Sequence, residues 1–229
     1  MSVKNQFSKY AKEYKNHNII QQIVAKSLVR ELKFQPKRIL ELGCGSGQVY
    51  NHISWDLEFY KAIDFSSSMC ELHPKGENIE VKCFDFDTQE FLDEIKDNSY
   101  DIVLSSSALQ WSKDLSKIIK HLSFITKEIN AVLFTSNTFK TIQKITNTKS
   151  PILDELSIKE AFSKYYTCEF ETIMYKLEFD NKKDLFDYIK KSGVSGEASL
   201  DFKDAKKLYK EYNLNYLEFE VIFVKTISK

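Results

Sequence analysis

The stretch that decides the fold is Glu41-Leu42-Gly43-Cys44-Gly45-Ser46-Gly47, which continues the short apolar segment 38–42. Glycine has no Cβ, so its backbone can adopt unusual dihedral angles and come close to a ligand. Glycines at alternate positions after a strand predict a tight strand-to-helix turn. In a doubly wound sheet, the turn after the first strand lies at the topological switch point, where cofactors bind.

Strand and helix patterns alternate on both sides of this turn. Expected strands cover 38–42, 59–65, 79–84, 100–105 and 131–136. Expected helices lie between them, at 48–53, 66–72, 88–95 and 115–124. Such alternation predicts a mostly parallel sheet with helices on both of its faces.

The two ends of the chain extend this pattern. Apolar residues on one face predict a helix up to about Leu32, which ends before Pro36. Helical patterns at 158–166, 182–192 and 202–212 accompany strand patterns at 170–179 and 216–226. We therefore expect one doubly wound, Rossmann-like α/β domain over 1–229 with an antiparallel C-terminal edge strand. Residues 1–35 would form a helical cap or lid, and 138–215 would carry substrate-side insertions.

Composition excludes several classes of function. The 33 Lys and Arg residues balance 33 Asp and Glu residues, which disfavours nucleic-acid binding. The N-terminus is polar and no apolar run approaches about 20 residues, so we expect a cytoplasmic protein without a membrane segment. Cys44, Cys70, Cys83 and Cys168 form no CxxC pair, which favours reduced thiols and no metal site.

Three kinds of cofactor compete for the glycine turn. A phosphate-binding NTPase loop needs Lys-Ser/Thr after its glycines, whereas Gln48 and Val49 follow here. A dinucleotide site needs G-x-G-x-x-G, and Glu41 beside the turn would repel a pyrophosphate. The same acid suits the ammonium of an amino-acid-bearing cofactor. Asp64 lies 21 positions after Gly43, close to the roughly 20 expected for an acid that binds a ribose diol. A glycine turn that only packs a helix on a strand remains the alternative.

An acid followed by G-x-G-x-G resembles the first motif of the class I S-adenosylmethionine (SAM)-dependent methyltransferases. This resemblance implies SAM as cofactor, S-adenosylhomocysteine as product and no metal. It places Asp85 at the adenine amino group, with Met69 and Phe86 against the ring. The cofactor-binding residues that it implies are Glu41, Gly43, Cys44, Gly45, Gly47, Asp64, Phe65, Met69, Asp85, Phe86, Ser105 and Ser106.

A second motif resembles a smaller group within these methyltransferases. The segment 100–111 ends in Ala-Leu-Gln-Trp, which resembles the malonyl-[acyl-carrier-protein] O-methyltransferases that start pimelate synthesis for biotin. Trans-aconitate methyltransferases are similar here. Segments 7–14, 191–196 and 217–225 also resemble the malonyl group, so the likeness covers nearly the whole chain. The region 138–156 departs from the pattern, because it is short and contains no Arg.

The resemblance implies esterification of a free carboxylate on malonyl-acyl carrier protein or malonyl-CoA. Carboxyl pKa values lie near 4, so the nucleophile is already an anion and needs no general base. Tyr14, Gln110 and Trp111 would position the substrate at the methyl group. An acidic carrier protein would meet a lysine-rich face. The two candidate faces are Lys140, Lys144 and Lys149, or Lys182, Lys183, Lys190 and Lys191.

Other functions stay open on the sequence alone. Trans-aconitate, another small carboxylic acid or a different metabolite could be the methyl acceptor. A catalytically silent SAM-fold scaffold is the alternative outside the enzymes. We expect a monomer.

Overall fold

The computed structural model describes residues 18–96, 98–191 and 202–227. Seven strands form one sheet in the order β3-β2-β1-β4-β5-β7-β6. The strands are β1 (Arg38–Leu42), β2 (Phe59–Asp64), β3 (Ile79–Cys83), β4 (Ile102–Ser106), β5 (Ile129–Phe134), β6 (Cys168–Glu178) and β7 (Tyr216–Thr226). β1 pairs in parallel with both β2 and β4, so the strand order reverses beside β1. This is the doubly wound arrangement that the sequence predicts.

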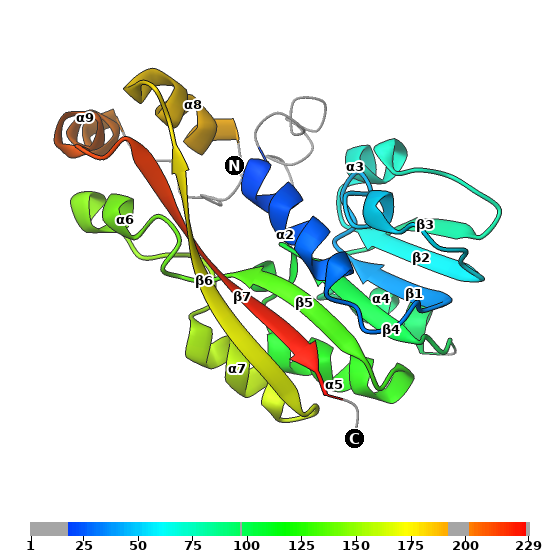
Figure 1. Ribbon diagram of the computed structural model, residues 1–229. Helices are drawn as coiled ribbons and strands as arrows, with labels where there is room; N and C mark the ends of the chain where they lie inside the picture. Colours follow the sequence, from blue (N-terminus) through cyan, green and yellow to red (C-terminus); the bar gives the residue numbers. More distant parts are fainter. Residues whose placement is uncertain (1–17, 97, 192–201, 228–229) are drawn as a thin grey trace.

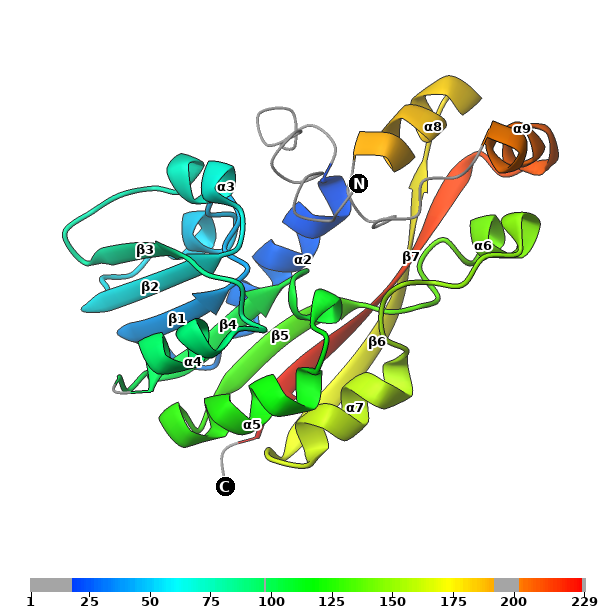
Figure 2. The same ribbon diagram turned by 180° about the vertical axis from the view of Figure 1, so that it is seen from behind.

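Helices cover both faces of the sheet. The helices are α2 (Ile19–Arg30), α3 (Ser67–Leu72), α4 (Gln89–Ile95), α5 (Leu115–Ile125), α6 (Lys140–Thr146), α7 (Glu155–Ser163), α8 (Lys182–Lys191) and α9 (Phe202–Glu211). Two 3₁₀ turns are η2 (Tyr50–His52) and η3 (Leu109–Trp111). α2 crosses one face (Figure 1), while α4, α5 and α7 cover the opposite face (Figure 2). α6, α8 and α9 gather at one end of β6 and β7 (Figure 1).

The burial of the central strands explains their composition. Every residue of β5 is buried, as are Ile102, Val103 and Leu104 in β4. Strands that are covered on both faces read as continuous apolar runs. One buried cluster lies under α2 and includes Val24, and the other lies under α5 and includes Ile119.

The C-terminal strands extend the sheet in antiparallel fashion. β7 runs antiparallel between β5 and β6, with Val132 opposite Phe223 and Ile173 opposite Val221. The predicted antiparallel addition is therefore confirmed, and β6 is the strand that lies at the edge. Burial along β6 alternates between half-buried and exposed for most of its length, as expected for an edge strand with one face toward solvent.

Polar side chains determine where several helices begin. Thr88 Oγ1 accepts a hydrogen bond from Phe91 N at 3.4 Å, which confirms the predicted start of α4. The carboxylates of Asp114 and Asp154 cap α5 and α7 in the same way, at 2.9 and 2.8 Å. Each cap satisfies a backbone N–H that has no partner within its helix.

Two local predictions need correction. The helix expected over 48–53 is only the 3₁₀ turn η2, because the indole of Trp55 donates to Pro36 O at 2.8 Å and turns the chain back toward β1.

α6 lies in the region 138–156, where the sequence pattern predicts no helix. Its first turn is held from β7, since Phe139 N donates to Glu218 O and Thr141 N donates to the Glu218 carboxylate.

Candidate functional site

The glycine turn is held between its two neighbouring strands. The N–H groups of Gly43 and Cys44 both donate to Ile63 O of β2, at 2.7 and 3.0 Å. Gly43 has φ +73°, and a Cβ built on it would lie 2.0 Å from Ala108 Cβ. Gly45 also has positive φ, but a Cβ built on it would have no atom within 4 Å. The first glycine is therefore required by packing, and the second by backbone conformation alone.

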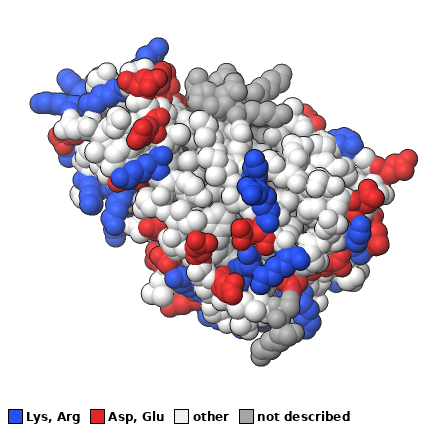
Figure 3. Space-filling model, in the orientation of Figure 1, with Lys and Arg blue, Asp and Glu red and all other residues white. Residues whose placement is uncertain are grey.

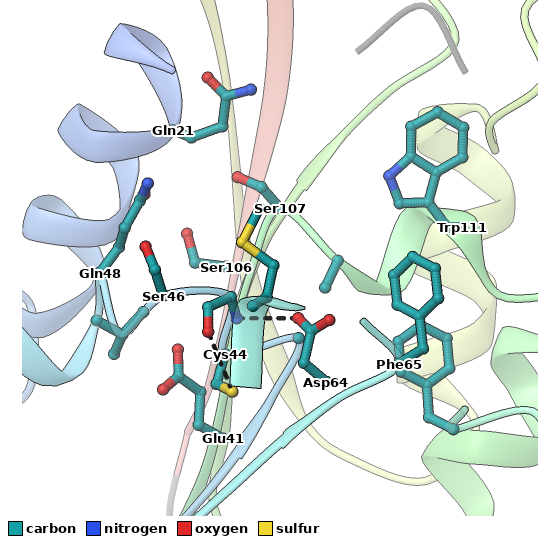
Figure 4. A pocket seen from close by; sticks show the side chains of 16 residues that line it. Gln21, Glu41, Cys44, Ser46, Gln48, Asp64, Phe65, Ser106, Ser107 and Trp111 are labelled. Atoms are coloured by element: carbon teal, nitrogen blue, oxygen red, sulfur yellow. Dashed lines mark hydrogen bonds between the residues drawn. The ribbon is translucent and has the colours of Figure 1, made fainter. Parts of the chain in front are cut away.

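Asp64 at the end of β2 organises this turn. One of its carboxylate oxygens accepts from Gly45 N at 2.9 Å (Figure 4). The other accepts from Ser66 N at 2.8 Å. Burial raises the pKa of Asp64 to about 6, although these backbone donors lower it. The acid that the sequence predicts for a ribose diol thus also fixes the shape of the turn.

Glu41 is the second buried acid of the site. It is 1% exposed and accepts a hydrogen bond from the Tyr60 hydroxyl. Burial raises the pKa of Glu41 to about 8. Burial lowers the pKa of His73, whose Nε2 lies 4.0 Å from Glu41, so the neutral imidazole supplies no compensating positive charge. Among the described neighbours, the carboxyl therefore lacks a cation, and a ligand ammonium would supply one.

A pocket opens above the turn, with a volume of about 660 Å³ that includes its solvent-facing part. The predicted residues that line it are Glu41, Gly43, Cys44, Gly45, Asp64, Phe65, Met69, Phe86, Ser106 and Trp111. They come from the ends of β1, β2 and β4 and from the segments that follow these strands and β3. The structure thus brings most of the predicted site together.

Four predicted residues lie beside the pocket rather than in its lining. Gly47 packs against Pro74, and the Ser105 hydroxyl donates to Leu42 O at 2.9 Å, which ties β4 to β1. Gln110 Nε2 donates to Ser107 O at 2.7 Å. Asp85 is exposed and accepts from Asp87 N at 3.0 Å, so its contact with adenine stays a prediction. Tyr14 lies outside the described residues.

Several lining residues are not among those that the sequence predicts, namely Gln21, Ser46, Gln48, Val49, Ser107 and Ala108. Gln21 is the most informative, because it is 4% exposed and its side chain enters the pocket from α2 (Figure 4). A signal for it exists in the sequence. Gln21 is a polar residue beside Ile20 on the apolar face of the predicted N-terminal helix. No comparable signal marks Ser107, whose φ of +60° depends on the folded loop.

Comparison with known proteins agrees with this architecture. Residues 40–131 match the family model described as a methyltransferase domain. The malonyl-[acyl-carrier protein] O-methyltransferase of Bacillus cereus is 24% identical over 91% of this chain and 86% of its own length. The YcgJ protein of Bacillus subtilis superposes with a TM-score of 0.63 at 13% identity, covering 90% of this chain and all of that one. A SAM-dependent methyltransferase of Thermotoga maritima gives 0.57 at 14% identity, covering 98% and 99% of the two chains.

The chain contains a methyltransferase domain and has the fold of SAM-dependent methyltransferases.

Unpartnered polar atoms show that the methyltransferase pocket fits a polar cofactor. The buried atoms Gln21 Oε1, Ser106 Oγ and Ser107 Oγ have no hydrogen-bond partner among the described residues. Buried polar groups are nearly always paired, so these atoms are suited to bonds with a ligand. Met69 and Phe86 add apolar walls suited to a planar ring.

The described residues offer neither a metal site nor a membrane-spanning helix. Within residues 18–96, 98–191 and 202–227, no cluster of three His, Cys, Asp or Glu side chains is arranged to hold a metal ion. No helix among those residues has the length and apolar character needed to cross a membrane.

Proposed function

We propose that this methyltransferase esterifies the free carboxylate of a malonyl thioester on acyl carrier protein, at the start of biotin synthesis. The observation that carries the proposal is the 24% identity to the Bacillus cereus enzyme of that name, which extends over 91% of the chain. The likeness therefore includes the C-terminal third, where an acyl substrate would bind, and is not confined to the cofactor motif.

The pocket residues divide between the two ends of SAM in this proposal. Glu41 binds the ammonium of the methionine part, and Asp64 holds the turn and the ribose. Met69, Phe65 and Phe86 contact the adenine, whose amino group meets Asp85. Bound SAM supplies an electrophilic methyl group. Gly45 leaves room for the cofactor because it presents no side chain to the pocket.

In this proposal the protein promotes methyl transfer by positioning the acceptor carboxylate and by excluding water from the pocket. Trp111 gives the acceptor side of the pocket an apolar wall, and Gln110 positions the Ser107 loop through its 2.7 Å bond. Alignment of the carboxylate with the reacting carbon lowers the barrier, because the cost of orientation is met on binding. An apolar wall also excludes water, which favours a step that neutralises charge.

No arginine is placed to hold the malonyl carboxylate. The two arginines of the chain, Arg30 and Arg38, lie at the end of α2 and the start of β1. Arg38 donates to Ser99 O at that end of the sheet, away from the pocket. In this proposal the hydroxyl of Ser107 donates to the carboxylate instead, since it is buried and unpaired among the described residues.

The test is methyl transfer from SAM to malonyl-acyl carrier protein, followed by intact mass. We expect a gain of one methyl group on the carrier-bound malonyl chain, well above the yield with free malonate, malonyl-CoA or trans-aconitate. Binding of SAM without methylation of any malonyl thioester would overturn the substrate. Transfer to trans-aconitate would instead indicate that the methyl acceptor is a small carboxylic acid. Absence of SAM binding would favour a catalytically silent scaffold.

The carrier protein is proposed to dock on a lysine face made of Lys140, Lys144 and Lys149. All three are exposed, and they border a shallow groove between α6 and the start of α7. Figure 3 shows further Lys side chains gathered over the same end of the molecule, around α8 and α9. Acidic carrier proteins complement such a surface. Of the second candidate cluster, Lys182 donates to Tyr209 O at 3.0 Å, and the side chains of Lys190 and Lys191 are not described.

Charge reversal of the lysine face tests this contact. The triple variant Lys140→Glu, Lys144→Glu, Lys149→Glu is expected to raise KM for malonyl-acyl carrier protein tenfold or more in low salt. Turnover of a malonyl thioester of a short neutral thiol should be unchanged. The matched control reverses Lys113, Lys117 and Lys120, which are exposed at and before α5 on another part of the surface. Equal KM values for both triple variants would refute docking on this face.

A further inference from the structure

A groove lies on the α2 face of the sheet and shares no lining residue with the cofactor pocket. One wall is the end of α2, with Ser27, Leu28 and Glu31, and the floor is formed by β7 and β6. α2 lies over β4 and β5, which leaves the outer part of this face uncovered (Figure 1). Asp and Glu side chains, with some Lys among them, gather over this part of the surface (Figure 3).

The strand register shows which side chains share the groove. Side chains that lie opposite each other on neighbouring strands point to the same face of the sheet. Lys225 of β7 lies opposite both Asn130 of β5 and Glu169 of β6. Two residues along, Phe223 of β7 lies opposite Glu171 of β6. All five side chains line the groove, so charged and amide groups adjoin an apolar floor.

Three polar side chains of the groove offer acceptors that lack a donor. Asn130 is 5% exposed, and its Oδ1 has no hydrogen-bond partner among the described residues. Lys225 Nζ donates to the Glu31 carboxylate at 2.9 Å, so its charge is used at α2 rather than at β6. Glu169 and Glu171 are exposed and form no ion pair with a described residue. Because buried polar groups are nearly always paired, Asn130 indicates a ligand that brings N–H donors.

We propose that this groove binds a linear polyamine, which is a chain of ammonium groups separated by short methylene segments. The ammonium groups supply the donors and the positive charge that Glu169, Glu171 and Asn130 lack. The two glutamates are two residues apart on one strand face, so their Cα atoms are roughly 7 Å apart. Neighbouring ammonium groups of a polyamine can bridge such a spacing. The methylene segments lie on apolar side chains such as Leu28 and Phe223.

The apolar floor distinguishes this site from a general attraction of cations to acidic side chains. A divalent metal ion needs several oxygen ligands and loses its water reluctantly. No group of three His, Cys, Asp or Glu side chains within 18–96, 98–191 and 202–227 is arranged to hold one. Methylene groups instead gain by leaving water on an apolar surface, and an ammonium over Phe223 or Tyr175 gains a cation–π attraction. The groove therefore favours an organic cation.

The experiment measures binding of spermidine to the full chain by calorimetry at a fixed ionic strength. We expect saturable binding at one site, which an equal concentration of Mg²⁺ does not displace. The double variant Glu169→Gln, Glu171→Gln should weaken spermidine binding at least tenfold. The matched control is Glu160→Gln, Glu178→Gln, which removes the same charge from exposed positions outside the groove and should bind as the wild type does.

Asn130→Leu separates the buried amide from the surface charge. This variant keeps the net charge and a similar side-chain volume, so spermidine affinity should fall at least threefold while the ligand-free protein melts at a higher temperature. The melting temperature rises because an unpaired buried oxygen is costly. Circular dichroism would check that each variant is folded.

Three outcomes would overturn the polyamine site. They are absence of saturable spermidine binding, displacement by equal Mg²⁺, and equal affinity in the two double variants. Spermidine binding is measured without methyl transfer and outside the cofactor pocket. Failure of the malonyl assay therefore leaves this test intact.

Discussion

Gly43→Ala is expected to cost about 3 kcal/mol or more of stability and to abolish measurable SAM binding. A side chain at φ +73° costs about 1–2 kcal/mol by itself. The new Cβ would also lie 2.0 Å from Ala108 Cβ, so the loop after β4 must move. Overpacking of this kind adds roughly 1–3 kcal/mol. Urea unfolding would measure the stability, and calorimetry with S-adenosylhomocysteine would measure the binding.

Gly45→Ala is the matched control for that result. It introduces the same methyl group at positive φ, but nothing lies within 4 Å of the new Cβ. We expect a loss of about 1–2 kcal/mol from backbone strain alone. If the two variants lost equal stability, packing of Gly43 against Ala108 would not be the reason for the first glycine.

Glu41→Gln is expected to have opposite effects on stability and on cofactor affinity. Burial raises the pKa of Glu41 from 4.5 to about 8 in the folded state. The folded protein therefore holds its proton more tightly than the unfolded chain does. This contribution to the free energy of unfolding is fully present below pH 4.5 and is lost as the pH rises through about 8.

The glutamine side chain of the Glu41→Gln variant does not ionise, so the variant does not lose this stability as the pH rises. At pH 9 the ligand-free variant should be more stable than the wild type by about 5 kcal/mol, because each pKa unit between 4.5 and about 8 corresponds to about 1.4 kcal/mol. Near pH 5 the two should differ by less than about 1 kcal/mol. Its affinity for S-adenosylhomocysteine at pH 7.5 should fall at least tenfold, because the ammonium loses its carboxylate. Thermal melts across pH with calorimetry would measure both effects. A variant that is less stable than wild type at every pH would contradict the buried, proton-binding role of Glu41.

The grouping of residues around the glycine turn could be predicted because its signal in the sequence is local. Glu41, Gly43 and Gly45 lie within five positions, and Asp64 ends the next strand. Parallel strands bring their C-terminal ends to one edge of the sheet, so strand order alone places these residues together. Other lining residues carry a weaker signal or none. Gln21 is a polar residue beside Ile20 on the apolar face of α2, whereas Ser107 reaches the pocket through a left-handed backbone angle that the folded loop determines.

The sequence by itself determined the kind of fold, the cofactor class and the alternating strands and helices, since apolar periodicity and glycine spacing act over a few residues. Only the tertiary structure decided the rest. It placed β7 between β5 and β6 and formed α6 through Glu218. These features depend on contacts between residues that are distant in the chain, and on the direction of each side chain once its strand ends.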